Sequence, residues 1–262
     1  MGHSYLYCKN TCQLPINLVY YIYCMKGCGS VKQNRTPLEV FLRYLVFIFS
    51  LFVLGLGIAV AKRADWGISP VTSFPNVLSL VPATDFLTVG QWLFLWNSLF
   101  TFGQILILRK NFQWIQLLQI PLSLTLGWFT DLWVGLLGKL PLESITNPIA
   151  TYGLKVLLVL FSVFLLALAV CLSVTANVVM NSGEAFVKAI ADTWHFKLGN
   201  VKTIFDLSCV TIAVVASLLI LHHLVGVGIG TVICATCTGF VVKWLMPVIK
   251  PLDTLLSLKR SI

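Results

Sequence analysis

The chain has 262 residues, of which 58% are hydrophobic and only 10% are charged, and its formal net charge is +9. A soluble domain carries roughly 25% charged residues, so this composition excludes an ordinary soluble enzyme and indicates a polytopic, all-α membrane protein in a lipid bilayer. The excess of Lys and Arg follows from their preference for cytoplasmic loops, and neither a nucleic-acid partner nor a cofactor is expected.

Residues 1–38 are polar to mixed, show no helical period, and are interpreted as an N-terminal cytoplasmic tail. Met25 is a plausible alternative start of translation, so residues 1–24 need not be native and are expected to be dispensable. The tail cysteines form two C-x3-C pairs, at Cys8, Cys12, Cys24 and Cys28. This spacing does not match common zinc sites, and no metal is predicted.

Six segments are long and apolar enough to cross a bilayer, which takes about 20 residues. In chain order they cover residues 44–61, 86–108, 112–137, 149–174, 200–221 and 226–249. Pro121 and Asp131 are expected to interrupt the third span. Two more segments, residues 70–81 and 184–196, are too short to span and are predicted to be broken or re-entrant half-helices.

The two half-helices belong to an internal repeat. Ala61–Phe74 and Ser173–Phe186 align without a gap at an offset of 112 residues, and each places a polar break after a long apolar segment. Three spans per repeat is an odd number, so the repeats insert with opposite orientation. The repeats are assigned to residues 39–138 and 149–250, followed by a C-terminal cytoplasmic tail at residues 251–262.

The distribution of basic residues predicts which side of the membrane each loop occupies. With the N-terminus in the cytoplasm, fourteen Lys and Arg residues are cytoplasmic and only Lys62, Arg63, Lys139 and Lys155 are outside. Both termini are therefore predicted to be cytoplasmic, and the loop at residues 138–148 is predicted to be outside. An eight-span alternative, with both short segments crossing, would place Arg109 and Lys110 outside and is disfavoured.

Cysteine labelling of intact cells tests this topology. A Ser144→Cys variant is expected to react with a membrane-impermeant maleimide, because the loop at residues 138–148 lies outside. A Lys110→Cys variant is expected to be protected. Protection at position 144 together with labelling at position 110 would reverse the assignment.

Two sequence elements resemble those of the YczE-like family of bacterial integral membrane proteins, grouped with YyaS and YitT. The first is the A-D-x-G-x-S-P pattern at Ala64–Pro70, and the second is the V-G-x-G-T pattern at Val227–Thr231. The resemblance covers roughly residues 40–250. It implies a protein of the bacterial cytoplasmic (inner) membrane, and it implies no particular chemistry. The second repeat departs from the pattern at Asn177 and Val179.

The first break carries candidate binding residues. Arg63 and Asp65 either cap the first helix and pair at the interface or line a cavity reached from outside. Irregular backbone at membrane depth is tolerated when it lines such a cavity. Ser69 and Thr72 then offer hydroxyls at the start of a half-helix, where the helix dipole favours an anionic group.

The second break carries the matching candidates, Asn177, Asn181 and Glu184. Inverted repeats place equivalent elements opposite each other near the midplane, so the two breaks are predicted to face each other across one polar cavity. Ser182 with Gly183 and Glu184 is alternatively a plain helix start, in which Ser182 caps the helix.

Other polar residues within the spans have simpler interpretations. Asn97 and Gln104 are expected to form interhelical hydrogen bonds. Lys202 and Asp206, four residues apart, are expected to pair on one helix face. Asp131 is an ionisable residue near a helix end, and His222–His223 is interpreted as a tight polar loop.

These observations favour a small permease-like protein that moves a polar or anionic solute between its repeats. The alternative is a non-transporting accessory protein that acts through a membrane partner protein. A polar cavity at the repeat interface favours the first function, whereas a dry interior with an exposed partner face favours the second. No nucleophile–base set is present in the sequence, so an enzyme is not expected.

Overall fold

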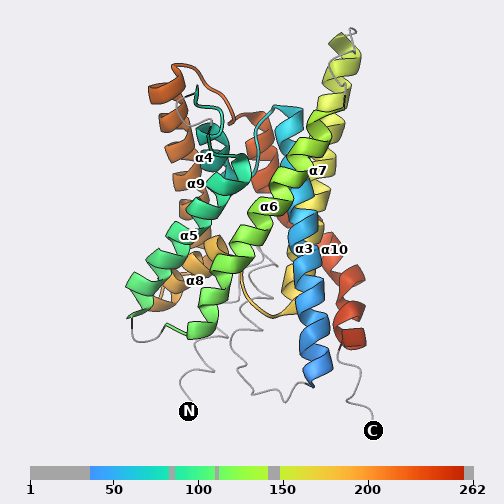
Figure 1. Ribbon diagram of the computed structural model, residues 1–262, viewed down its shortest axis with the longest axis vertical. Coiled ribbons are helices and arrows are strands. Elements are labelled where there is room, and N and C mark those ends of the chain that lie inside the picture. Colours follow the sequence, from blue (N-terminus) through green and yellow to red (C-terminus); the bar gives the residue numbers. More distant parts are fainter. Residues whose placement is uncertain (1–35, 83–85, 110–111, 141–147, 257–262) are drawn as a thin grey trace.

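The computed structural model describes residues 36–82, 86–109, 112–140 and 148–256, and these residues form helices and no strands (Figure 1). The helices are α3 (Pro37–Ala64), α4 (Pro70–Leu78), α5 (Val89–Leu108), α6 (Gln119–Gly138), α7 (Pro148–Ala176), α8 (Ser182–Trp194), α9 (Leu198–Ala216) and α10 (Ile229–Leu256). A 3-10 turn, η3 (Trp114–Leu118), leads into α6, and a π-helical turn, η5 (Ser217–Leu221), ends α9. Within these described residues, six segments are long and apolar enough to cross a membrane, which confirms the predicted fold class.

The backbone at the two breaks shows that the halves share one register of 112 residues. The helix before each break ends in a left-handed residue, Asp65 with φ 56° and Asn177 with φ 49°. Asp and Asn visit this conformation more readily than most other residues that carry a Cβ. The residue before each half-helix also matches, because φ and ψ are −56° and 146° at Ser69 and −57° and 144° at Asn181. The predicted repeat is therefore a repeat of backbone conformation.

The repeats exchange their half-helices. α3 and α7 form the central pair and run in opposite directions (Figure 1). α6 packs on α3, and its counterpart α10 packs on α7. Half-helix α8 packs on α5, and half-helix α4 packs on α9. Each half-helix thus contacts a span of the opposite repeat, so neither repeat is complete without the other.

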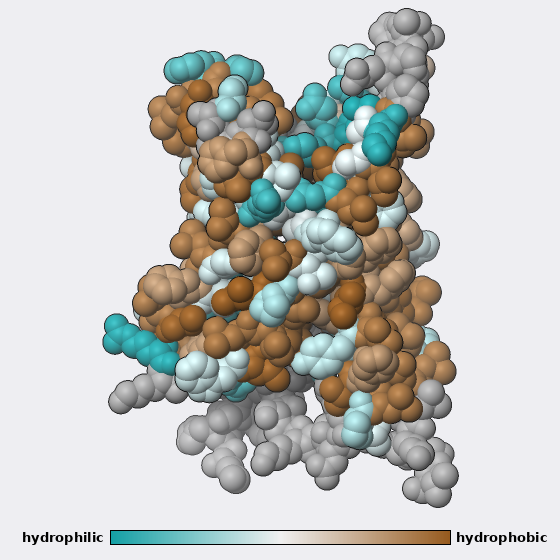
Figure 2. Space-filling model, in the orientation of Figure 1, coloured by the Kyte–Doolittle hydropathy of each residue, from teal (hydrophilic) through white to brown (hydrophobic). Residues whose placement is uncertain are grey.

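The central pair forms the core, and the outer spans face lipid. In α3 and α7, 56% of the most apolar 18-residue stretch is buried, against 22–28% in the other four spans. Gly57 supports the close α3–α7 contact, because a Cβ there would lie 3.1 Å from the Leu166 side chain. The outer spans expose large apolar side chains, and the surface in Figure 2 is correspondingly hydrophobic over most of its height.

Three helices differ from the sequence-based expectation. α6 is continuous, because Pro121 occupies its first turn, where proline is tolerated. The expected interruption at Pro121 and Asp131 is therefore wrong. α5 begins at Val89 because Thr88 and Gln91 form a capping box. α10 continues to Leu256, which is buried, and passes both Pro247 and Pro251.

Candidate functional site

The N-termini of the two half-helices meet. A Cβ placed on Gly183, the second residue of α8, would lie 3.5 Å from Cγ1 of Val71, the second residue of α4. These residues are equivalent in the repeat, so the contact lies on the pseudo-two-fold axis that relates the halves. Each helix N-terminus carries unsatisfied N–H groups and a partial positive charge. Two such termini therefore converge on one place.

A cavity of about 230 Å³, called here the central cavity, opens beside this contact. Both half-helix starts line it, together with polar side chains from three spans. The polar and small lining residues include Ser69, Thr72, Asn97, Asn181, Glu184, Lys202, Asp206, Thr238 and Gly239. Four of the seven predicted site residues, namely Ser69, Thr72, Asn181 and Glu184, thus share one cavity.

Asn97 contributes a carboxamide to the central cavity from the middle of α5. Its side chain is 7% exposed and also reaches a small adjoining cavity. Among the described residues the Asn97 side chain has no hydrogen-bond partner, so the expected interhelical bond is wrong. A buried carboxamide without a protein partner costs roughly 1–3 kcal/mol unless water or a ligand satisfies it. Asn97 therefore offers one donor group and one acceptor to whatever occupies the cavity.

The charged residues of the central cavity are largely balanced. Nζ of Lys202 lies 2.6 Å from Oδ1 of Asp206 on the same face of α9, which confirms the predicted pair. Glu184 lies in the first turn of α8, where its negative charge opposes the positive end of the helix dipole. α4 has no acidic residue in its first turn. The start of α4 thus has no acidic residue of its own, although Glu184 and Asp206 line the same cavity.

The cavity exists because the second repeat is less tightly packed than the first. In the first repeat, α5 and α6 touch at Gly90 and Gly127, where a Cβ on Gly90 would lie 2.6 Å from the Gly127 carbonyl carbon. The equivalent positions in the second repeat are Lys202 and Gly239. α9 and α10 do not form a packed pair there. The Lys202 side chain cannot fit where a glycine allows backbone contact, so the second pair of spans stays apart and leaves the cavity.

A buried polar network holds the start of α8 against the first repeat. Nε2 of Gln104 donates to Oε1 of Gln119 and to the Ser182 carbonyl, each at 3.0 Å, which confirms the interhelical role expected for Gln104. The Ser182 hydroxyl contacts the hydroxyls of Thr101 and Ser123, both at 3.2 Å. α8 begins at Ser182, which confirms the plain helix start, but the N-cap is Asn181, so Ser182 does not cap the helix. Its hydroxyl belongs to the buried network instead.

Three predicted site residues lie away from the central cavity. Asp65 and Asn177 are exposed residues at the C-terminal ends of α3 and α7, so the capping interpretation holds for Asp65. Arg63 and Asp65 line a separate cavity of about 620 Å³ between α3, α6 and α7, called here the α3/α6/α7 cavity. The prediction that all seven residues share one cavity is wrong, because the helix end and the half-helix start are separated by a loop. Figure 2 shows hydrophilic side chains gathered in the notch of the upper half of the molecule.

The two family-like motifs contact each other. The Gly230 N–H donates to the Trp66 carbonyl at 2.7 Å. A Cβ on Gly228 or Gly230 would lie 2.7 Å from that oxygen, and a Cβ on Gly67 would lie 2.7 Å from the Gly228 nitrogen. Gly67 also has φ +99°, which residues with a Cβ rarely adopt. The glycines of both motifs therefore dock the first break onto the start of α10.

The fold and the cavity define an α-helical, multi-pass membrane protein built from two inverted repeats with two half-helices. A family model described as "Family of unknown function (DUF6198)" matches residues 41–247, and the chain belongs to this family. No curated protein and no solved structure matches the chain. The family match does not link the chain to the YczE-like group specifically, so that resemblance rests on the two motifs alone.

Proposed function

We propose that the protein moves a small polar or anionic solute across the membrane through the central cavity. The observation that carries this proposal is the meeting of the α4 and α8 N-termini, at Val71 and Gly183, beside a shared polar cavity. In transporters built from inverted repeats, half-helix N-termini at the repeat interface bind anionic or polar groups of the substrate.

The size and charge of the cavity restrict the solute. A volume of about 230 Å³ is below the range of about 300–1,000 Å³ typical of drug-sized ligands. The Lys202–Asp206 pair is neutral as a unit, and Glu184 offsets one helix dipole. This balance favours an uncharged polar molecule or a singly charged small anion. Asn97 supplies directional hydrogen bonds, and the N–H groups at the start of α4 supply a partial positive charge.

The cellular setting of this function follows from the sequence. We place the protein in the bacterial cytoplasmic membrane with both termini inside, on the charge bias and on the YczE-like motifs. The solute then passes between the cytoplasm and the exterior. An accessory role through a membrane partner protein is the alternative, and flux measurements separate the two.

Stopped-flow light scattering of proteoliposomes tests transport. The probes are glycerol and urea as uncharged solutes, and ammonium formate, acetate and nitrate as sources of small anions. The protein is expected to accelerate vesicle re-swelling for at least one of these two groups. Because a hydrogen bond to the solute is worth about 1–3 kcal/mol, Asn97→Leu is expected to lower the rate about tenfold. Asn97→Leu keeps the side-chain size, so its unfolding temperature should not fall.

A blocking variant and a matched control complete the test. Gly183→Leu places a bulky side chain at the contact with Val71 and should abolish flux. Gly153→Leu on α7 is the control, since a Cβ there meets nothing within 4 Å. Transport is rejected if no probe moves faster than through protein-free vesicles. It is also rejected if both Gly183→Leu and Asn97→Leu, purified as folded protein, conduct like the wild type.

A further inference from the structure

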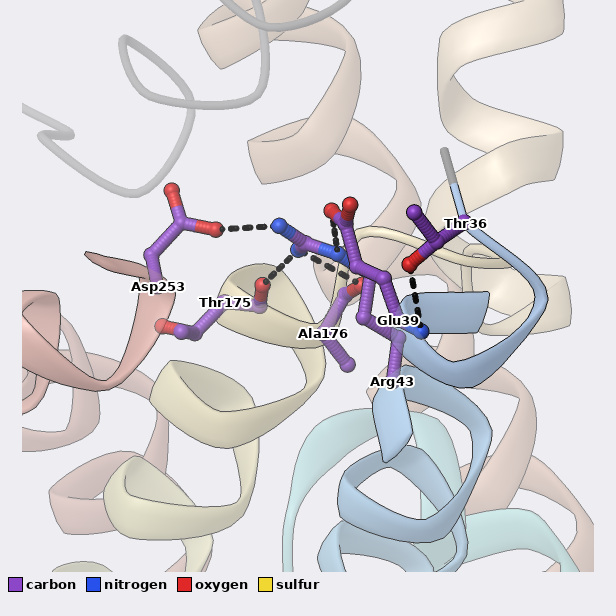
Figure 3. Close-up of polar contacts among 6 residues, drawn as sticks. All are labelled: Thr36, Glu39, Arg43, Thr175, Ala176 and Asp253. Carbon is purple, nitrogen blue, oxygen red and sulfur yellow. Dashed lines mark hydrogen bonds and ion pairs between the residues drawn. The ribbon is translucent and has the colours of Figure 1, made fainter. Parts of the chain in front are cut away.

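Arg43 is a buried cation whose charge is fully satisfied inside the protein. Its side chain is 4% exposed, and the guanidinium contacts Oε1 of Glu39 at 2.9 Å and Oδ1 of Asp253 at 3.0 Å (Figure 3). It also donates to the carbonyls of Thr175 and Ala176, at 3.1 and 3.3 Å. The arginine of α3 thus binds the C-terminal end of α7 and the last turns of α10, with two carboxylates to balance it.

The inverted repeat contains the equivalent cation without the equivalent carboxylates. Arg43 corresponds to Lys155 of α7 at the 112-residue offset. Glu39 corresponds to Thr151, which has no charge. Asp253 corresponds to Pro141, which lies outside the described residues and cannot carry a negative charge. The repeat therefore keeps the positive group and replaces both negative ones.

A large cavity lies beside Lys155. Lys155 and Thr151 line the α3/α6/α7 cavity of about 620 Å³, together with Lys62, Arg63 and Asp65. Among the described residues, Lys155 makes no ion pair. Lys62 donates to the Ser79 hydroxyl, and Arg63 donates to the Leu140 carbonyl.

Among the described residues that line the cavity, the charge is positive overall. Three of these residues are cations and one, Asp65, carries a carboxylate. Asp131 also attracts the Lys62 ammonium, but it accepts hydrogen bonds from Gly90 and Thr88 across the α5–α6 contact. The remaining walls, from Ala59 and from leucines of α6 and α7, are apolar. Cations in a partly apolar cavity are costly unless an anion accompanies them.

We propose that the α3/α6/α7 cavity binds a phosphate or carboxylate anion, whose charge replaces the two carboxylates that hold Arg43 in the other repeat. Lys155 is the principal contact, and Lys62 and Arg63 complete the positive field. The anion is either a free ion or the headgroup of an anionic lipid, since both present the same oxygen atoms to the lysine. This site is separate from the central cavity and does not depend on transport.

The test measures binding rather than flux, on the full chain in nanodiscs of phosphatidylcholine. In the first arm, radiolabelled inorganic phosphate and acetate are titrated as free anions. In the second arm, native mass spectrometry measures the retention of phosphatidylglycerol against phosphatidylcholine. Because Lys155→Gln removes a charge-assisted hydrogen bond to the anion, it is expected to weaken binding at least about tenfold in one of the arms.

Two further variants distinguish a site from general surface charge. Lys155→Arg should retain binding. Lys139→Gln removes an exposed positive charge at the end of α6 that does not line the cavity, and it should leave binding unchanged. The proposal is overturned if the wild type shows no saturable binding in either arm, or if Lys139→Gln weakens binding as much as Lys155→Gln. Neither outcome would affect the flux experiment.

Discussion

Replacing Arg43 with methionine is expected to destabilise the folded protein by about 3 kcal/mol, because breaking a buried ion pair by removing one partner typically costs about 3–5 kcal/mol. The lower end applies, since the Asp253 side chain is 37% exposed and retains some solvation. Methionine fills much of the same space but leaves Glu39 and Asp253 without their cation, and the Thr175 and Ala176 carbonyls without their donor. The free energy of unfolding, measured by titration with sodium dodecyl sulfate, checks this.

The repeat offers a matched control for this variant. Lys155→Met removes the equivalent cation, but no carboxylate pairs with it among the described residues, so the loss should stay below about 1 kcal/mol. Arg43→Lys keeps the charge and loses the geometry of the guanidinium fork, so an intermediate loss is expected. Equal losses for Arg43→Met and Lys155→Met would show that the network around Arg43 does not stabilise the fold.

Introducing a single methyl group at Gly90 is expected to destabilise the protein by about 3 kcal/mol, at the upper end of the usual cost of overpacking. The Cβ of Gly90→Ala would overlap the Gly127 carbonyl, lying 2.6 Å from its carbon atom. The obstacle is backbone on both helices, so α5 and α6 must move apart. That movement would also break the hydrogen bond of 2.8 Å from the Gly90 N–H to Asp131.

Gly135→Ala on α6 is the control for Gly90→Ala. A Cβ at Gly135 meets nothing within 4 Å, and alanine is favoured over glycine in a helix by roughly 1 kcal/mol. Gly135→Ala should therefore unfold at the same or a slightly higher temperature than the wild type. If Gly90→Ala behaves like Gly135→Ala in thermal unfolding, the close approach of α5 and α6 is not present in the folded protein.

Comparison of the two repeats shows that the sequence already contained a signal for the central cavity. Gly90 and Gly127 align with Lys202 and Gly239, and a lysine at a glycine contact indicates that the second helix pair cannot close in the same way. This difference could have predicted the cavity between α9 and α10. Likewise, alignment of Glu39 with Thr151 could have singled out Arg43 and Lys155, neither of which was among the predicted site residues.

The position of Asn97 could not be predicted in this way. A mid-helix asparagine that bonds to a neighbouring span and one that faces a cavity can occur in the same sequence pattern. Sequence periodicity therefore does not distinguish these two roles. Gln104, which lies two turns further along α5, does bond to Gln119 and to Ser182. Which of the two residues finds a partner depends on where α8 of the other repeat docks on α5.

The sequence by itself determined the six spans, the two half-helices and the inverted register, because hydropathy over about 20 residues and the breaks at Asp65 and Asn177 are local properties. Only the tertiary structure decided that Ser69, Thr72, Asn181 and Glu184 share a cavity while Arg63, Asp65 and Asn177 do not. The cavity forms where the half-helices exchange between repeats and where α9 and α10 fail to pack. The exchange depends on contacts between residues that are distant in the chain, such as Gln104 and Ser182, which are 78 residues apart, and no local pattern encodes such contacts.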